Sequence, residues 1–270
     1  MYMLLLVVLG AIVLFTTFMV KPKRRIHRRL VSLGLLLVVV GGSGIYESYQ
    51  NNGTSPGDNP RQVEKTTTSS SSNLANLNYQ TDQEIEVNNN TPTFTKAELN
   101  VSQGPWQRFA DLDNLNRAIQ ADALLSKSLM PTAKREPLYV NPTGWHNKKI
   151  NGGWLYNRSH LIGYQLTGQN NNPKNLMTGT RSLNSPEMLK HENDIAYYIK
   201  QNPNNYIRYR VKPIYRGNEL VARGVQMMAE SLTQSGQPDN GISFNVYIFN
   251  VEKGVKINYS DGTSVVNNNY

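Results

Sequence analysis

Histidine is the side chain best suited to move a proton near neutral pH, and the chain has four histidines. His27 lies in a run of Lys and Arg and needs no catalytic explanation. His146 stands next to a tryptophan, where packing accounts for it, and His191 falls within an expected surface helix, where it would be solvated. His160 directly precedes an apolar segment. Taken alone, it is better explained as a buried histidine with satisfied hydrogen bonds.

Amide and carboxylate side chains follow His160 at spacings that suit a metal site. Asn184 comes nine residues after Asn175, and Glu192 comes eight residues after Asn184. Hydrolysis of a phosphodiester needs a base for water and a cation for the leaving oxygen. Mg²⁺ prefers oxygen ligands and keeps several waters, so one amide and one carboxylate are enough. Because asparagine is abundant in this chain, ordinary turn roles explain the spacing equally well.

Two ordered motifs, NRSHLIGYQL at 157–166 and NNNPKNLMTGTRSLN at 170–184, resemble the core of the DNA/RNA non-specific endonuclease family. The likeness is strongest to the streptococcal DNA-entry and secreted DNases. It extends to PTGWHN, YIRYRVKPIY and FNVYIFNVEKGVKINYSDG, and so covers most of 105–262. It implies a ββα-metal core, in which a central sheet carries the catalytic histidine and the metal-binding helix on one side.

The resemblance also implies roles for individual residues. His160 would be the general base, assisted by Asn175, and Asn184 would bind Mg²⁺, for which Mn²⁺ can substitute. Glu192 would orient metal-bound water, and Arg158 would bind the phosphate. Attack in line with the 3′ oxygen would leave 5′-phosphate and 3′-hydroxyl ends.

The chain departs from the family's Asp-Arg-Gly-His motif at two positions. Asn157 replaces the acid, which removes a charge near the base, and Ser159 replaces the glycine, which adds a side chain at a tight turn. Ala196 stands where some members carry an arginine. Arg181 and Lys174 are therefore expected to supply further positive charge to the substrate.

The elements that position these residues are helix first and strands later, without an alternating βαβ rhythm. Helical spacing over 112–129 and a Ser-Pro start at 185–186 predict two helices, the second ending near Gln201. Alternation and β-branched residues predict strands at 205–217, 219–227 and 242–254. The fold class is therefore α+β, with a central, mostly antiparallel sheet.

The N-terminal 46 residues are mostly apolar. Runs at 1–20 and 30–46 flank a basic loop at 21–29, which predicts a membrane anchor of two helices with the loop inside and both ends outside. The alternative is a cleaved signal peptide with 30–42 as its apolar region. Both interpretations export the rest of the chain to the outer cell surface.

Residues 47–95 are rich in Ser, Thr and Asn and carry few large apolar side chains, which predicts a flexible linker. Residues 96–270 have a globular composition and form the expected nuclease domain. The net charge of +9 suits a polyanionic partner such as nucleic acid, and the expected partners are DNA and, as a second substrate, RNA. The lack of cysteine excludes thiolate chemistry. A non-catalytic surface receptor for DNA and a sugar-binding module are the alternatives, and the sequence does not separate DNA uptake from nutrient scavenging.

Overall fold

The computed structural model describes residues 71–267 of the chain. The expected membrane anchor at 1–46 and the first part of the expected linker lie outside this range. Within 71–267, no helix is long and apolar enough to cross a bilayer.

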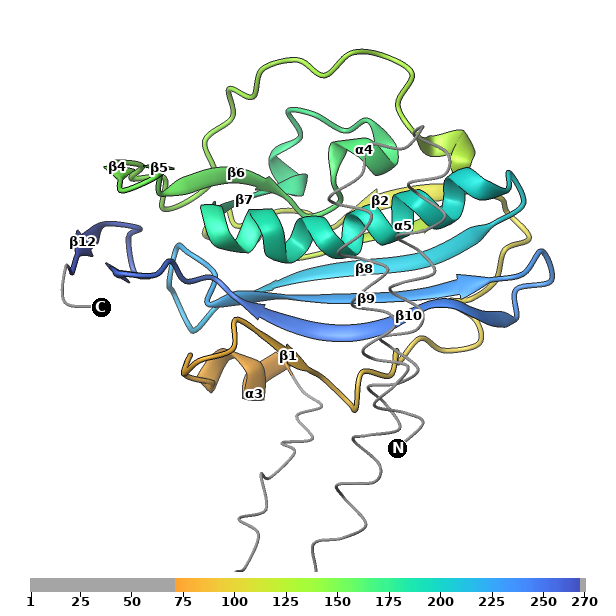
Figure 1. Cartoon of the computed structure of the whole chain (residues 1–270), viewed down its shortest axis with the longest axis horizontal. Coiled ribbons are helices and arrows are strands. Elements are labelled where there is room, and N and C mark those ends of the chain that lie inside the picture. Colours follow the sequence, from red (N-terminus) through yellow and green to blue (C-terminus); the bar gives the residue numbers. More distant parts are fainter. Residues whose placement is uncertain (1–70, 268–270) are drawn as a thin grey trace, which may run out of the picture. The chain divides into compact units, whose positions relative to one another are not determined.

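A six-stranded antiparallel sheet forms the centre of the fold, in the order β1-β10-β9-β8-β3-β2 (Figure 1). Its strands are β1 (Glu84–Glu86), β2 (Trp106–Phe109), β3 (Ala121–Leu125), β8 (Tyr206–Ile214), β9 (Gly224–Leu232) and β10 (Pro238–Phe249). Alternate residues of β8, such as Ile207 and Tyr209, point into the main core, while Arg208 points to the other face. The predicted α+β class with a central antiparallel sheet is confirmed.

The first face of the sheet carries the elements that line the cleft described below. Helix α5 (Leu189–Gln201) runs along it, and a separate strand pair, β6 (Tyr156–His160) with β7 (Leu176–Thr180), lies nearby together with the short helix α4 (Tyr164–Thr167) (Figure 1). Side chains from these elements and from the sheet share one apolar core. The remaining elements are α3 (Ser71–Asn76), β4 (Lys149–Ile150), β5 (Gly153–Trp154), β11 (Val255–Ile257) and β12 (Ser264–Val266).

The second face of the sheet is covered by residues 73–105, most of which were expected to be linker. Leu74 of α3 is buried in a cluster with Tyr247 and Phe249 of β10, and β1 pairs with β10. The flexible linker predicted over 47–95 is therefore wrong from residue 71 onward. A few apolar side chains spaced along a polar segment were enough, because the sheet already presents a face for them to cover.

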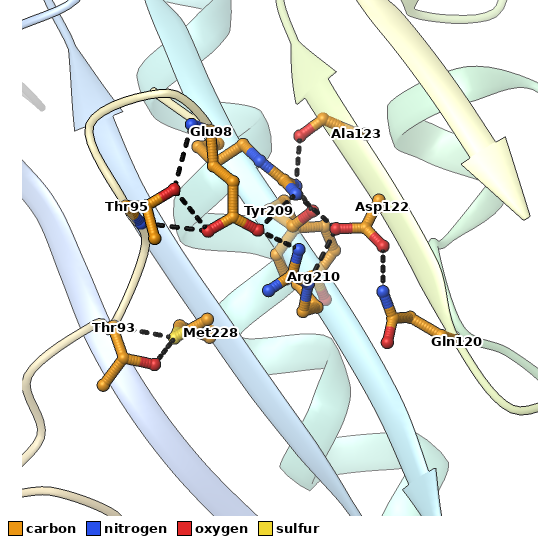
Figure 2. Close-up of polar contacts among 10 residues, drawn as sticks. Thr93, Thr95, Glu98, Gln120, Asp122, Ala123, Tyr209, Arg210 and Met228 are labelled. Atoms are coloured by element: carbon orange, nitrogen blue, oxygen red, sulfur yellow. Dashed lines mark hydrogen bonds and ion pairs between the residues drawn. The ribbon is translucent and has the colours of Figure 1, made fainter. Parts of the chain in front are cut away.

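A charged network lies under this covering segment (Figure 2). Asp122 accepts hydrogen bonds from Arg208 and from Arg210 Nε, the latter at 2.7 Å. Glu98 pairs with Arg210 and accepts hydrogen bonds from Thr95, at 2.9 Å from its backbone nitrogen. Arg208 is only 2% exposed, so this network buries a full positive charge that needs its carboxylate partner.

Two predictions about elements need correction. The helix predicted over 112–129 is wrong, because Ala121–Leu125 form strand β3 in the interior of the sheet, with all five residues buried. A strand buried on both faces loses its polar alternation and can imitate helical spacing. The predicted strand at 219–227 is displaced, since β9 covers Gly224–Leu232. The helix predicted to end near Gln201 does so, after an irregular turn at Leu183–Met188.

Candidate active site

His160 ends strand β6, where pairing with Leu176 of β7 fixes its backbone. Its side chain is buried, and its Nε2 lies 2.8 Å from the carbonyl oxygen of Asn170. A carbonyl oxygen can only accept, so Nε2 carries the proton and Nδ1 keeps its lone pair. The fold therefore holds His160 in the tautomer that a base requires.

The surroundings of His160 favour its neutral form. Burial lowers the pKa of His160, the positive charge of Arg135 lowers it further, and the hydrogen bond to Asn170 opposes this only in part. The imidazole is therefore unprotonated at neutral pH and can accept a proton.

Asn175 holds the chain that follows His160. Its Oδ1 accepts a hydrogen bond from the backbone nitrogen of Ile162 at 2.9 Å, and its Nδ2 donates to the carbonyl oxygen of the same residue at 3.0 Å. Its own carbonyl accepts from Leu161. Asn175 is fully buried and does not line the cleft, so its geometry is that of a positioning residue for the turn after His160.

A cleft of about 1100 Å³ opens beside His160. It brings together four of the residues predicted from the sequence, namely His160, Arg158, Asn184 and Glu192. Its other lining residues are Arg135, Leu138, Trp145, His146, Asn147, Trp154, Tyr156, Asn157, Gly163, Tyr164, Gln165, Met188 and Leu189. The cleft is lined by cationic, amide and aromatic side chains, which is suitable for an anionic substrate with flat bases.

Arg158 is fixed two residues before His160 on β6. Its Nε donates to the carbonyl oxygen of Val140 at 2.9 Å, and its Nη2 donates to Asn141 Oδ1 at 2.6 Å. Its guanidinium lies over the ring of Trp145, 4.6 Å from the centroid. Nη1 makes no hydrogen bond to any residue of the described range, so it can donate to a phosphate oxygen.

Glu192 and Asn184 come from the helical segment after β7. The Glu192 carboxyl is buried against Gly163, where an added Cβ would lie 2.4 Å from its Oε2. Burial raises the pKa of Glu192 to about 8, although the N–H of Gly163, the charge of Arg135 and the amide of Gln165 lower it. Glu187, an earlier acid of the same helical segment, pairs with an exposed lysine and does not line the cleft, so Glu192 is the better candidate for the acidic group of the site.

The donor set fits a divalent cation with few protein ligands. Among the described residues, the Asn184 side chain makes no hydrogen bond, the Glu192 carboxyl makes no ion pair, and no cluster of three or more His, Asp or Glu side chains could hold a metal. An amide oxygen and a buried acid that line the same cleft suit a hard cation that keeps most of its waters. A cation nearby would also lower the pKa of Glu192 and favour its carboxylate form.

Arg181 and Lys174 lie outside the cleft, although both were expected to contact substrate. Arg181 donates to the carbonyl oxygen of Gly152 and pairs with Glu252 at 3.3 Å, so it supports the hairpin of β4 and β5. Lys174 pairs with the exposed Asp111 at 2.7 Å.

His191 was expected to be solvated, and this is wrong. Its Nε2 lies 2.6 Å from Glu84 Oε2, its side chain is only 14% exposed, and its ring packs on Phe244. Glu84 belongs to β1, which was expected to be linker, so the solvent-exposed interpretation failed together with the linker boundary. His146 bonds through Nδ1 to the carbonyl of Asp261 at 2.7 Å, and it also lines the cleft.

The serine that departs from the family motif is accommodated by a glycine on the neighbouring strand. Ser159 Oγ is buried, and a Cβ added at Gly179 of β7 would lie 2.3 Å from it. Asn157 lines the cleft, as a residue at the motif's first position should. With both residues present, β6 keeps its pairing with β7 through His160.

Sequence reasoning missed Arg135, Tyr164 and Trp154 as lining residues. Arg135 and Trp154 come from a loop and a hairpin, and nothing in their spacing pointed to the cleft. Tyr164 lies inside the NRSHLIGYQL motif, four residues after His160, and that proximity was a signal that could have found it.

A neutral, tautomer-fixed histidine, an arginine beside it, and an amide and a buried acid from the following helix define a nuclease-type hydrolytic site on an α+β fold. The family model described as DNA/RNA non-specific endonuclease matches residues 99–233. The chain belongs to this family.

Similar proteins agree with this assignment. A deoxyribonuclease of Streptococcus dysgalactiae subsp. equisimilis is 32% identical over 174 residues, which cover 62% of this chain and 50% of that protein, so the chain spans half of the relative's length. NucA from Streptococcus agalactiae, solved with a magnesium ion bound, superposes with a TM-score of 0.61 at 25% identity over 72% of this chain and 93% of NucA. Sda1 nuclease, solved with a bound zinc ion, superposes with a TM-score of 0.52 at 26% identity over 59% and 81%.

Proposed function

We propose that this protein is a Mg²⁺-dependent endonuclease that hydrolyses DNA without sequence preference at the outer cell surface. The observation that carries the proposal is the placement of His160, with a free Nδ1, in one cleft with Arg158, Asn184 and Glu192. Family membership and the similarity to a deoxyribonuclease support DNA as substrate. The family description also makes RNA a substrate to test.

The reaction follows from the residues of the cleft. His160 takes a proton at Nδ1 from a water molecule, which attacks phosphorus in line with the 3′ oxygen. Arg158, held by Val140 and Asn141, donates from Nη1 to a phosphate oxygen. The bond between phosphorus and the 3′ oxygen breaks, the 3′ oxygen takes up a proton from solvent water, and the products are a 5′-phosphate and a 3′-hydroxyl.

Asn184 would hold the metal ion, and Glu192 would accept a hydrogen bond from a water next to it. When bound, Mg²⁺ supplies a Lewis acid that offsets negative charge on the leaving oxygen. The magnesium ion in NucA and the zinc ion in Sda1 support a divalent metal, and Mn²⁺ is expected to substitute.

The lack of sequence preference follows from the kind of contacts that the cleft offers. Arg158 and Arg135 bind phosphates, and contacts to phosphates carry no sequence information. The helix α5 contributes Glu192 and Leu189 to the cleft but no basic side chain that would read base edges. Cleavage is therefore governed by access to the backbone.

The proposed location of the protein at the outer cell surface rests on residues 1–46. Their two apolar runs and basic loop suit a membrane anchor with the nuclease domain outside. A protein tethered in this way suits the uptake of DNA more than its digestion at a distance. Protease added to intact cells should release the domain, and a domain protected until lysis would contradict the surface location.

The test of the activity is digestion of plasmid DNA by the purified protein with Mg²⁺ or with EDTA. His160→Ala should lose at least ~10²-fold activity, the low end for removal of a general base. His146→Ala is the matched control and should lose much less, because His146 lines the same cleft but is exposed and lies outside the NRSHLIGYQL motif. A wild-type protein that binds DNA but cleaves none with any divalent metal would favour the receptor alternative.

A further inference from the structure

The hairpin of β4 and β5 presents an exposed tryptophan at the cleft. Trp154 is 53% exposed and lines the same cleft as His160 and Arg158. Most large apolar side chains of the described range that are exposed, such as Tyr139 and Tyr197, lie away from the cleft. An exposed indole at a substrate site has a ring face available for a ligand.

The hairpin is held rigidly at its base and its turn. Arg181 donates to the carbonyl oxygen of Gly152, and its own backbone nitrogen donates to Leu155 at 2.8 Å. Gly152 and Gly153 have φ of +88° and +134°, a backbone that other residues rarely adopt. The backbone that carries Trp154 is therefore restrained by these contacts, which reduces the entropy lost when the ring binds a ligand.

A cation accompanies the ring. The Nζ of Lys149, the strand partner of Trp154, lies 5.7 Å from the centroid of its ring. An aromatic face with a neighbouring ammonium group matches a nucleotide, which has a flat base and a phosphate. The remaining cleft offers Arg158 for the adjacent phosphate.

We propose that Trp154 and Lys149 form a stacking subsite for an unpaired base next to the scissile phosphate. The inference rests on the proposed nuclease function and adds the substrate class. A base inside a duplex is already stacked on both faces, so only a single-stranded or frayed nucleotide can use this ring. The protein therefore prefers single-stranded DNA over a duplex of the same sequence.

The experiment compares kcat/KM of the full-length protein on a single-stranded oligonucleotide and on its duplex, in Mg²⁺. Trp154→Ala should lower the single-strand to duplex ratio ~10-fold, mainly through KM, which corresponds to about 1.4 kcal/mol and lies in the range for stacking on one base. Trp154→Phe should keep most of the ratio. Tyr197→Ala is the control, because Tyr197 is 71% exposed on α5 and does not line the cleft.

A binding measurement separates this inference from the proposed function. Fluorescence anisotropy in EDTA gives the Kd of a labelled single strand without cleavage. Trp154→Ala should weaken it ~10-fold, and the wild-type protein should bind a strand with abasic sites as weakly as the variant binds the normal strand. Equal losses on single strand and duplex, or no loss, would overturn the stacking subsite. A wild-type protein that cleaves nothing while these Kd differences persist would overturn the nuclease and keep the subsite.

Discussion

Asp122→Ala should destabilise the protein strongly without touching the cleft. Arg208, 2% exposed on the second face of the sheet, would lose its closest carboxylate. Leaving one partner of a buried ion pair uncompensated costs about 3–5 kcal/mol. Glu98 lies 3.9 Å from Arg208 and can compensate in part, so we expect the lower end, about 3 kcal/mol.

Denaturant unfolding followed by circular dichroism measures this loss directly. Asp111→Ala is the matched control, because that carboxylate makes its ion pair with Lys174 on the surface, and it should leave the midpoint unchanged. A loss below about 1 kcal/mol for Asp122→Ala would refute the argument, since it would mean that Arg208 is hydrated or repaired by Glu98 alone.

Acid provides a second check on the same network. Burial alone would raise the pKa of Asp122, but hydrogen bonds from Arg208 and Gln120 and the two arginine charges outweigh this and lower it. A lowered pKa means that the stabilisation is fully present above the ordinary value of 3.8 and is lost as the pH falls below it. The wild-type protein should therefore lose more stability than Asp122→Ala as the pH falls through this range.

Two further predictions concern the cleft. Arg135→Gln should raise the pKa of His160, because a nearby positive charge disfavours the imidazolium, and should move the acid limb of the kcat/KM profile to higher pH. Lys134→Gln is the control, and a limb that stays in place would show that Arg135 does not act on the base. Glu192→Gln should lose ~10- to 100-fold in kcat/KM, as residues that orient the surroundings of a metal commonly do. Glu187→Gln should cut nearly normally, and the opposite result would move the acidic partner to Glu187.

The part of the site that sequence predicted lies in one continuous stretch. His160, Asn184 and Glu192 belong to two paired strands and the helix that follows, so local geometry alone decides that they meet. Arg135 and Trp154 depend instead on how a long loop and a glycine hairpin pack on that motif. Their positions follow from contacts between distant residues, such as Arg181 with Gly152, which no spacing rule contains.

The two wrong predictions about the fold each have a physical reason. Ala121–Leu125 is buried on both faces, so the alternation that marks a strand is missing and the helical interpretation was preferred. Residues 71–95 look too polar to fold, but their few apolar side chains, such as Leu74, bury against Tyr247 and Phe249 of the sheet, and their polar side chains also find partners. Glu84 bonds to His191 of α5 on the first face, and Glu98 pairs with Arg210 and lies near Arg208 on the second face. A polar segment can be ordered when its partners are polar too.

The covering segment, residues 73–105, also contacts an element of the first face. Glu84 of β1 bonds to His191, which directly precedes Glu192 on α5. The segment outside the nuclease motif thus contacts the helix that supplies the buried acid, at a residue whose ring packs on Phe244 of the sheet. Glu192 of α5 lies against Gly163, and Gly163 directly follows Ile162, whose backbone Asn175 holds. A shift of α5 would therefore displace the turn that follows His160. The covering segment is therefore part of the support of the active site, although none of its residues lines the cleft.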